Sequence, residues 1–210
     1  SAQQYIDIFN QCRDMICKHS SALMNSKRDE AFEAFQRVGF PTKKVERYKY
    51  TDIEALFAPN YGLNLNRLDI PVNPYDAFKC DVPNMSTSLY FVVNDAFYKK
   101  ALPKAELPEG VFVGSLADFS ANAAFGKVSA MYCQLADDKD AITSLNTMLA
   151  QDALLIYFPK GVKVDRTLQV INILRSDVDL MVNRRVLIYL EDRADARILF
   201  CDHAADDRNF

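Results

Sequence analysis

The chain has 210 residues, of which 50% are hydrophobic and 25% are charged, with a formal net charge of −3 and a pI of about 5.4. A chain of this length buries about 70% of the surface that its unfolded form exposes, so it needs no disulfide or metal to fold. The acidic balance argues against general binding to polyanions, which requires a basic surface. No apolar run approaches the roughly 20 residues that span a bilayer, and the polar N-terminus lacks an apolar signal core. We therefore expect a cytoplasmic protein.

The cysteine pattern agrees with this compartment. The cysteines are odd in number and widely spaced, and no Cys-x-x-Cys motif occurs; they are Cys12, Cys17, Cys80, Cys133 and Cys201. Such a pattern favours buried or free thiols in a reducing cytosol over a disulfide framework.

The first part of the chain has apolar residues at helical spacing. Residues 3–25 repeat apolar side chains three and four positions apart, and a second helix fits residues 27–38. Gly39 is expected to end this second helix, and Pro41 prevents its continuation. We expect the two helices to form an antiparallel hairpin with facing apolar stripes.

A third helix is predicted from a capping box. In Thr51-Asp52-Ile53-Glu54, the Thr51 side chain is expected to accept from the amide near Glu54, and Glu54 to reach back. A short helix then runs to about Phe57. Residues 58–83 are rich in proline and asparagine, which predicts a surface connection.

The middle of the chain predicts short elements. Residues 88–93 and 96–98 flank Asn94-Asp95, and a tight hairpin is expected there because both residues tolerate positive φ. A short strand is predicted at 111–113, and short helices are predicted at 116–123 and 141–149.

From residue 153 the pattern changes to apolar strands with no amphipathic helix between them, at 153–158, 168–174, 186–190 and 196–201. This spacing suits stacked β-rungs, a sandwich or a meander, and periodicity alone does not choose among them. Residues 206–209 are turn-like, and no closing element follows. We therefore expect an N-terminal fragment of a longer protein.

A basic and aromatic run lies at residues 41–50. It holds four basic groups and one acid, with Tyr48 and Tyr50 interleaved. Such a run suits a stacking and phosphate platform for single-stranded nucleic acid. It equally suits a packed connector, whose tyrosines hold the chain to the core while the Lys and Arg heads stay solvated. The acidic background and the lack of a second basic cluster favour the connector.

Potential metal ligands near the N-terminus are poorly placed for one ion. On a helix, Cys12 and Cys17 point about 140° apart, and Cys12 and His19 share a face but lie about 10 Å apart. Zinc needs ligand bonds of about 2.0–2.3 Å, so neither pair suits it. We expect buried structural cysteines here.

A denser cluster is Cys201-Asp202-His203, followed by Asp206-Asp207. Thiolate, imidazole and carboxylate groups suit zinc or iron in principle. Alternation along a strand, however, points Cys201 and Asp202 to opposite faces, which favours a core cysteine before an acidic turn. Lys160-Gly161 lacks the rest of a phosphate-loop motif and predicts a plain β-turn.

The segment from Pro41 to Thr51 resembles the Pro-Thr-Arg-Lys-x-Glu-x-Trp-Lys-Tyr-Thr signature of the SufB/SufD family of iron–sulfur cluster assembly proteins, in its SufD branch. Lys43 stands where Arg is usual, and Tyr48 stands where Trp is usual. The matching positions are Pro41, Thr42, Lys44, Glu46, Lys49, Tyr50 and Thr51.

Later stretches resemble the same family in the same order, at residues 153–162, 168–173, 185–191 and 198–203. Arg193 replaces a glycine that is common after the acidic turn, so that turn is expected to have a different shape. The resemblance spans about residues 30–210. It favours SufD over its paralogue SufB, which lacks the Pro-Thr-x-Lys-x-Glu opening.

The resemblance implies a mainly β fold in three parts. These are an N-terminal helical region with a hairpin at 1–57, a small mixed α/β region at 58–150, and the first rungs of a right-handed parallel β-helix at 151–210. Each coil of such a stack covers the core of the one before. A chain cut at Phe210 would leave one end uncovered, so a second copy is expected to cap it as a homodimer.

The resemblance also implies a function. It predicts a non-catalytic scaffold subunit that acts with SufB and the ATPase SufC, without nucleic acid or membrane as a partner. The family's cluster-forming residues and SufC-binding helices are expected beyond Phe210, so no catalytic, cofactor-binding or metal residue is predicted here. An iron–sulfur cluster, and a flavin, would belong to the assembled complex.

Other functions remain open from the residues alone. A β-helical carbohydrate-active enzyme would need paired carboxylates about 5–9 Å apart. Asp165, Asp177, Asp179 and Glu191 supply acids, but nothing in the sequence pairs them. The remaining alternative is a single-stranded nucleic-acid-binding module in the Lys43–Tyr50 run, built on Lys43, Lys44 and Arg47.

Overall fold

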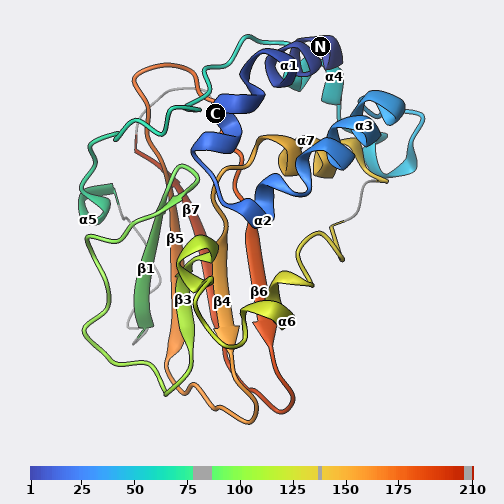
Figure 1. Ribbon diagram of the computed structural model, residues 1–210. Coiled ribbons are helices and arrows are strands. Elements are labelled where there is room, and N and C mark those ends of the chain that lie inside the picture. The colour runs from blue at the N-terminus through green and yellow to red at the C-terminus, as the bar shows by residue number, and fades with distance from the viewer. Residues whose placement is uncertain (78–86, 137–138, 206–209) are drawn as a thin grey trace. The chain divides into compact units, whose positions relative to one another are not determined.

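The chain forms two compact units, each made of two segments. The computed structural model describes residues 1–77, 87–136, 139–205 and 210 (Figure 1). Residues 1–68 and 126–151 form one unit, here called the helical unit, and residues 69–125 and 152–210 form the other, the sheet unit. The three regions expected from the sequence stay a prediction, but 126–151 belongs with the N-terminal helices. Among the described residues, no helix combines the length and apolar character needed to span a membrane.

The described elements of the helical unit are all helices. They are α1 (Ala2–Lys18), α2 (Ala22–Asn25), α3 (Arg28–Val38), the 3-10 helix η1 (Glu46–Tyr48), α4 (Ile53–Phe57), α6 (Phe125–Ser129), which begins at the unit boundary, and α7 (Ala141–Leu149). The expected helix at 141–149 is confirmed. The sequence pattern missed α6 and η1, which are only one turn long.

The expected helix at 3–25 is wrong as one continuous element. α1 ends at Lys18, and α2 begins after Ser21, whose side chain accepts from the Met24 amide. The adjacent Ser20 hydroxyl donates to the Gln151 carbonyl at 2.8 Å. These two serines form side-chain hydrogen bonds that favour a break over a continuous helix.

The expected capping box at Thr51 is also wrong, although the helix that follows it is confirmed. The N-cap of α4 is Asp52, whose carboxylate accepts from the Ala55 amide at 3.0 Å. Glu54 does not reach back to the cap but accepts from the Ser1 amine. Asp is as good an N-cap as Thr or better, so the cap moves by one residue.

Aromatic rings fill the space between the N-terminal helices. α1 and α3 pack together, and Phe9 stacks on Phe32 with 4.5 Å between ring centroids. Tyr5, Phe9 and Ile16 form the buried stripe of α1. The prediction that the apolar stripes of these two helices face each other is confirmed.

A buried arginine joins these helices to α7. Arg28, at the start of α3, is 0% exposed. Its Nη1 donates to the carbonyl oxygens of Met148 at 3.1 Å and Ala150 at 2.6 Å, at the C-terminal end of α7. Its other nitrogens donate to Ser20 and Asn25. A guanidinium at this end meets both the unpaired carbonyls and the negative end of the helix dipole.

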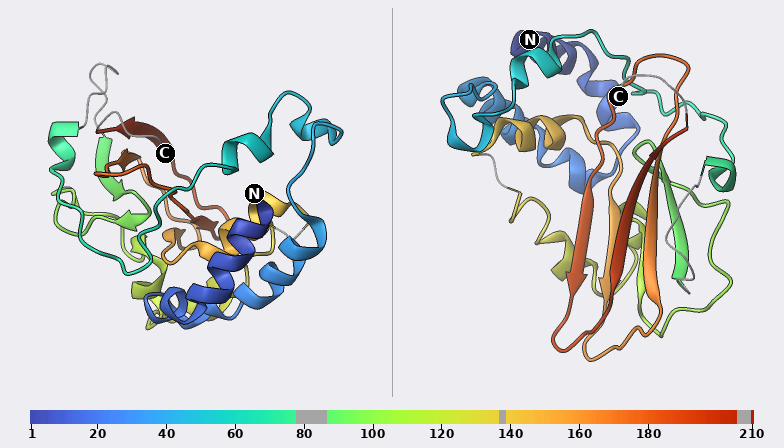
Figure 2. Two further views of the ribbon diagram at one scale, coloured as in Figure 1. Left: turned by 90° about the horizontal axis from the view of Figure 1, so that it is seen from above. Right: turned by 180° about the vertical axis from the view of Figure 1, so that it is seen from behind.

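The sheet unit contains α5 (Pro74–Ala77), η2 (Leu116–Phe119) and two sheets. One sheet has the order β2-β1-β5-β7, and the other has the order β3-β4-β6. The strands are β1 (Thr87–Val93), β2 (Ala96–Phe97), β3 (Phe112–Ser115), β4 (Leu154–Phe158), β5 (Thr167–Leu174), β6 (Val186–Leu190) and β7 (Ile198–Ala204). Figure 2 shows the strands from behind, running alongside one another.

The strands after residue 153 alternate between the two sheets. β4 pairs with β6 in parallel, and β5 pairs with β7 in parallel, so each sheet receives every second strand. β1 adds to β5 in parallel, while β2 and β3 pair antiparallel with β1 and β4. The expected strands are confirmed in this region, and they form mixed sheets. The described strands do not by themselves close a β-helix.

Two successive turns have the same backbone form and stack on each other. Val162 N donates to Pro159 O, and Ala194 N donates to Glu191 O, closing turns that follow β4 and β6. The third residue of each turn has positive φ, at 72° for Gly161 and 61° for Arg193. Gly161 N also donates to Asp192 O at 2.9 Å, which links one turn to the next. The plain turn at Lys160-Gly161 is confirmed. Arg193 adopts a positive φ like that of Gly161, and the expected difference from the family's turn stays a prediction.

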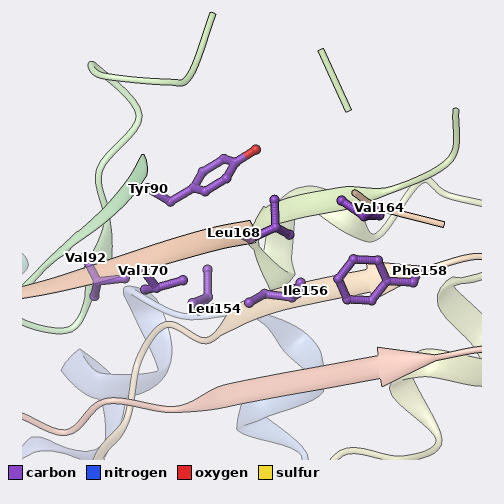
Figure 3. Packing of buried hydrophobic residues seen from close by; sticks show 8 residues of the cluster. All are labelled: Tyr90, Val92, Leu154, Ile156, Phe158, Val164, Leu168 and Val170. Carbon is purple, nitrogen blue, oxygen red and sulfur yellow. The ribbon is translucent and has the colours of Figure 1, made fainter. Parts of the chain in front are cut away.

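The main core of the sheet unit lies between its two sheets. Figure 3 shows its buried side chains, contributed by β1, β4, β5 and the loop before β5: Tyr90, Val92, Leu154, Ile156, Phe158, Val164, Leu168 and Val170. Phe91, Ile171 and Ile173 are buried on the opposite face of the β1–β5 sheet. Strands buried on both faces need the continuous apolar runs seen in this sequence.

The last strand of each sheet leaves its apolar side chains partly uncovered. Val186, Ile188 and Leu190 of β6 lie in register with the buried Leu154, Ile156 and Phe158 of β4, yet they are 43%, 40% and 46% exposed. Phe200 of β7, opposite Val170, is 41% exposed. The apolar pattern therefore repeats in β6 and β7 without the cover that β4 and β5 have.

Other predicted elements differ in detail. The hairpin at Asn94 is confirmed: Asn94 has φ of 54°, and its amide side chain pairs with the Arg175 backbone. The strand expected at 111–113 runs one to two residues later, and the helix at 116–123 is a 3-10 turn over 116–119. The connection expected at 58–83 contains α5, and its residues 78–83 lie outside the described residues, as does Cys80.

Replacing Arg193 by glycine should raise the free energy of unfolding by about 0.5–1 kcal/mol. Relief of the left-handed strain outweighs the added entropy of the unfolded chain. Gly161 offers the matched control, because a Cβ there would meet no atom within 4 Å and only backbone strain would act. Gly161→Ala should therefore lower the same quantity by about 1 kcal/mol in denaturant titrations. A loss of stability in Arg193→Gly would contradict the equivalence of the two turns.

Candidate functional site

The basic and aromatic run begins at a ring cluster. Phe40 contacts Phe57 with 4.9 Å between ring centroids, Phe35 with 5.3 Å and Tyr5 with 5.8 Å. These rings come from α1, α3 and α4. Gly39, with φ of 66°, ends α3 as expected and lets the chain turn into the cluster. The start of the run is therefore fixed by packing.

The second attachment of the run is a carboxylate on α7. The Tyr48 hydroxyl donates to Asp140 Oδ2, and Arg47 Nη1 lies 3.1 Å from the same oxygen. Asp140 Oδ1 accepts from the Ile142 and Thr143 amides, so the same side chain caps α7. Asp140 thus joins the run to the N-terminal end of α7.

The Tyr48 hydroxyl keeps its proton for this hydrogen bond. Burial raises the pKa of Tyr48, and the hydrogen bond to the Asp140 carboxylate raises it further. The protonated hydroxyl therefore donates to the ionised Asp140 carboxylate, which can only accept.

Most positive charge in the run is paired within the helical unit. Lys43 lies 3.3 Å from Asp52, Lys49 pairs with Glu46, and Arg47 pairs with Asp140. The pKa of Asp52 is lowered by the Ala55 amide and then by Lys43. Among the described residues, Lys44 has no ion-pair partner. The run therefore presents less unpaired positive charge than its sequence suggests.

The two tyrosines of the run behave differently. Tyr48 is half-buried and bonded to Asp140, as the connector interpretation predicts. Tyr50 is 90% exposed, and its ring contacts the Lys49 ammonium at 5.1 Å from the ring centroid. The prediction that both tyrosines hold the chain to the core is wrong for Tyr50.

A hollow of about 570 Å³ lies beneath the run, within the helical unit. Its walls come from the end of α3, the run itself and the start of α7. They are Val38, Gly39, Phe40, Pro41, Thr42, Val45, Arg47, Tyr48, Lys139, Asp140 and Ala141. Most of the lining surface is apolar, and Thr42, Arg47, Tyr48, Lys139 and Asp140 contribute polar groups. This volume falls within the roughly 300–1,000 Å³ of protein ligand pockets.

The cysteines considered for metal binding are not brought together with other ligands. Cys12, Cys17, Cys133 and Cys201 are not in disulfides, and each is partly exposed, so the expectation of fully buried cysteines at 12 and 17 is wrong. No group of three or more His, Cys, Asp or Glu side chains in the described part of the chain is arranged to hold a metal ion.

The cluster at Cys201 separates as strand alternation predicts. Cys201 packs against the apolar cluster that contains Phe91 and Ile171, and its sulfur accepts from Gln169. Asp202 instead lies 2.8 Å from Arg184, which holds the pKa of Asp202 below its usual range. Asp206 and Asp207 lie outside the described residues.

The acids considered for a glycosidase have structural contacts. Glu191 accepts from the Tyr157 hydroxyl and the Lys160 amide, and so helps to hold its turn. Asp177 pairs at the surface with Arg175. The Asp165 backbone carbonyl accepts from Arg197. None of these contacts joins two of the considered acids to each other.

Sequence reasoning missed Arg28 and Asp140. Arg28 lies three residues before Ala31 and seven before Phe35, so it belongs to the buried stripe of α3. A charged residue in an otherwise apolar stripe was the signal from which a buried arginine could have been predicted. Asp140 directly precedes an apolar helix, which is the pattern of an N-cap. Each also bonds to a residue more than 90 positions away in the chain, Arg28 to the Ala150 carbonyl and Asp140 to Tyr48, and the sequence does not reveal those two contacts.

Removing the Tyr48 hydroxyl should destabilise the helical unit. Tyr48→Phe should lower the free energy of unfolding by about 1 kcal/mol or more, because Asp140 loses a charge-assisted hydrogen bond. Tyr50→Phe is the control and should change stability by less than about 0.5 kcal/mol. Equal stability of Tyr48→Phe and Tyr50→Phe in urea titrations would disprove the role of the hydroxyl.

Comparison with protein families places most of the chain in a known family. A family model described as the SufBD protein N-terminal region matches residues 1–170, which include the whole helical unit and the sheet unit as far as β5. No curated protein matches the chain. Because the matched residues cover more than half of the sequence, the chain belongs to the SufBD family, whose N-terminal region it contains.

Proposed function

We propose that this protein is a non-catalytic scaffold subunit of iron–sulfur cluster assembly, equivalent to SufD, and that it acts in the cytoplasm with SufB and the ATPase SufC. Family membership supports the process, since SufBD proteins belong to iron–sulfur cluster assembly. The signature at residues 41–51 supports the SufD branch, because its Pro-Thr-x-Lys-x-Glu opening is present.

The observation that carries the scaffold role is the parallel stack of the sheet unit. Strands alternate between two sheets, and the turn after β6 lies on the turn after β4 through the Gly161–Asp192 hydrogen bond. From this alternation we propose that the sheet unit is the start of a parallel β-helix. Stacked coils grow by adding strands in register, whether from the same chain or from a partner.

The uncovered strands supply the surface for such growth. Val186, Ile188, Leu190 and Phe200 lie in register with buried residues but are partly exposed. Apolar side chains in a row at a sheet end gain stability when another strand covers them. A further coil, a SufB subunit or a second copy of the chain would cover these apolar side chains.

A scaffold needs docking surfaces and not an active site of its own. Cluster ligands and a flavin would be supplied at the level of the assembled complex. The thiols described here are not in disulfides, as a reducing compartment requires.

Copurification tests this proposal. The affinity-tagged protein, coexpressed with SufB and SufC under reducing conditions, should retain both partners. Ile188→Asp should reduce the retained SufB at least tenfold, because a carboxylate would interrupt the apolar row of β6. Val178→Asp is the matched control, since Val178 is 57% exposed and lies between β5 and β6. Circular dichroism verifies that both variants fold. Failure of the unchanged protein to retain either partner would refute the scaffold role.

A further inference from the structure

We propose that the hollow beneath the basic and aromatic run binds a short acidic peptide segment of a partner protein, one that places an apolar side chain next to carboxylates. This site belongs to the helical unit alone and does not depend on the scaffold role. It is built by residues 38–48 and 139–141.

The floor and rim of the hollow select an apolar side chain. Phe40, Pro41 and Ala141 line it, and Val38 and Val45 are 48% and 44% exposed. An extended peptide covers both the floor and the exposed valines. The shape therefore favours a segment of a protein.

The polar side of the hollow, formed by Asp140 and Arg47, favours a ligand with a negatively charged group. Both oxygens of Asp140 already accept hydrogen bonds, from the Ile142 and Thr143 amides and from Tyr48, and Arg47 neutralises its charge. Arg47 is itself 76% exposed and meets Asp140 through Nη1, and its guanidinium carbon lies 5.7 Å from the Tyr48 ring centroid, so Nε and Nη2 remain as donors for a ligand. A guanidinium with free donors binds a carboxylate in a bidentate manner.

A second positive group lies on the same run. Lys44 is exposed and, within the part of the chain that the structure describes, has no ion pair. It adjoins Val45, whose side chain lines the hollow. Positive charge beside an apolar rim is complementary to an acidic and apolar segment.

The same geometry disfavours a nucleic acid. Binding of single strands needs successive exposed aromatic faces along a basic groove. Tyr50 is exposed, but Tyr48 is bound to Asp140, and three of the run's basic groups are paired with acids. A peptide carboxylate needs only one or two unpaired donors.

Titration of the isotopically labelled full chain with designed peptides tests this site by amide NMR. The probe is an acetylated, amidated Glu-Leu-Glu-Phe-Glu peptide, and its controls replace Glu by Lys, or Leu and Phe by Ser. The probe should give saturable shifts confined to residues 38–48 and 139–141, and each control peptide should bind at least tenfold more weakly. Added salt should weaken the binding of the probe.

Two variants and one control locate the contacts. Lys44→Glu and Val45→Asp should each weaken binding of the probe about tenfold, the first by charge and the second by interrupting the apolar rim. Lys18→Glu makes the same charge change at an exposed site on α1 and should leave binding unchanged. Thermal melting confirms that each variant is folded.

Three results would overturn the proposal. They are no saturable shift with the probe, equal binding of the lysine peptide, and tighter binding of an oligothymidylate at the same residues. Because these readouts use the helical unit's own amides, they are independent of whether SufB and SufC copurify with the protein.

Discussion

The charge of one buried arginine meets the carbonyl end of α7, and the rest of the helical unit is arranged around that contact. Arg28 donates to carbonyls at residues 148 and 150 and to side chains at 20 and 25. A guanidinium buried without these acceptors would be strongly unfavourable, so α1, α2, α3 and α7 have to come together for Arg28 to be accommodated. Burial lowers the pKa of Arg28, but arginine still keeps its charge at neutral pH.

The N-terminal end of α7 positions the basic and aromatic run. Asp140 caps the helix and receives Tyr48 and Arg47 from the run, so the run's position depends on where α7 lies. The rings around Phe40 fix the start of the run. The hollow is the space left between these attachments, and its shape follows from them. In the sheet unit the corresponding constraint is the register between successive strands, which sets each turn upon the next.

Local patterns predicted most elements but not the contacts that join them. The strands after 153, the hairpin at Asn94 and α7 were predictable because apolar periodicity and turn residues are local signals. Two adjacent serines divided the first predicted helix, and Asp52 replaced Thr51 as the N-cap of α4. In both places, side chains one or two residues apart offer the backbone hydrogen bonds of similar energy, so the local sequence does not determine which one forms. Arg28 and Asp140 each bond to a residue far along the chain. The ion pairs of Lys43, Arg47 and Lys49 with acids could not be predicted from the number of charges in the run either.

Substitution of Arg28 tests the account of the helical unit most directly. Arg28→Met keeps a long side chain but removes every donor, and it should cost about 3 kcal/mol or more of unfolding free energy because buried carbonyls lose their partner. The amides of α7 should then exchange with solvent faster, while those of β5 stay protected. Arg13→Met is the matched control, since Arg13 forms an exposed pair with Asp29 that is worth less than about 1 kcal/mol. Equal losses in the two variants, with α7 protection unchanged, would contradict the account.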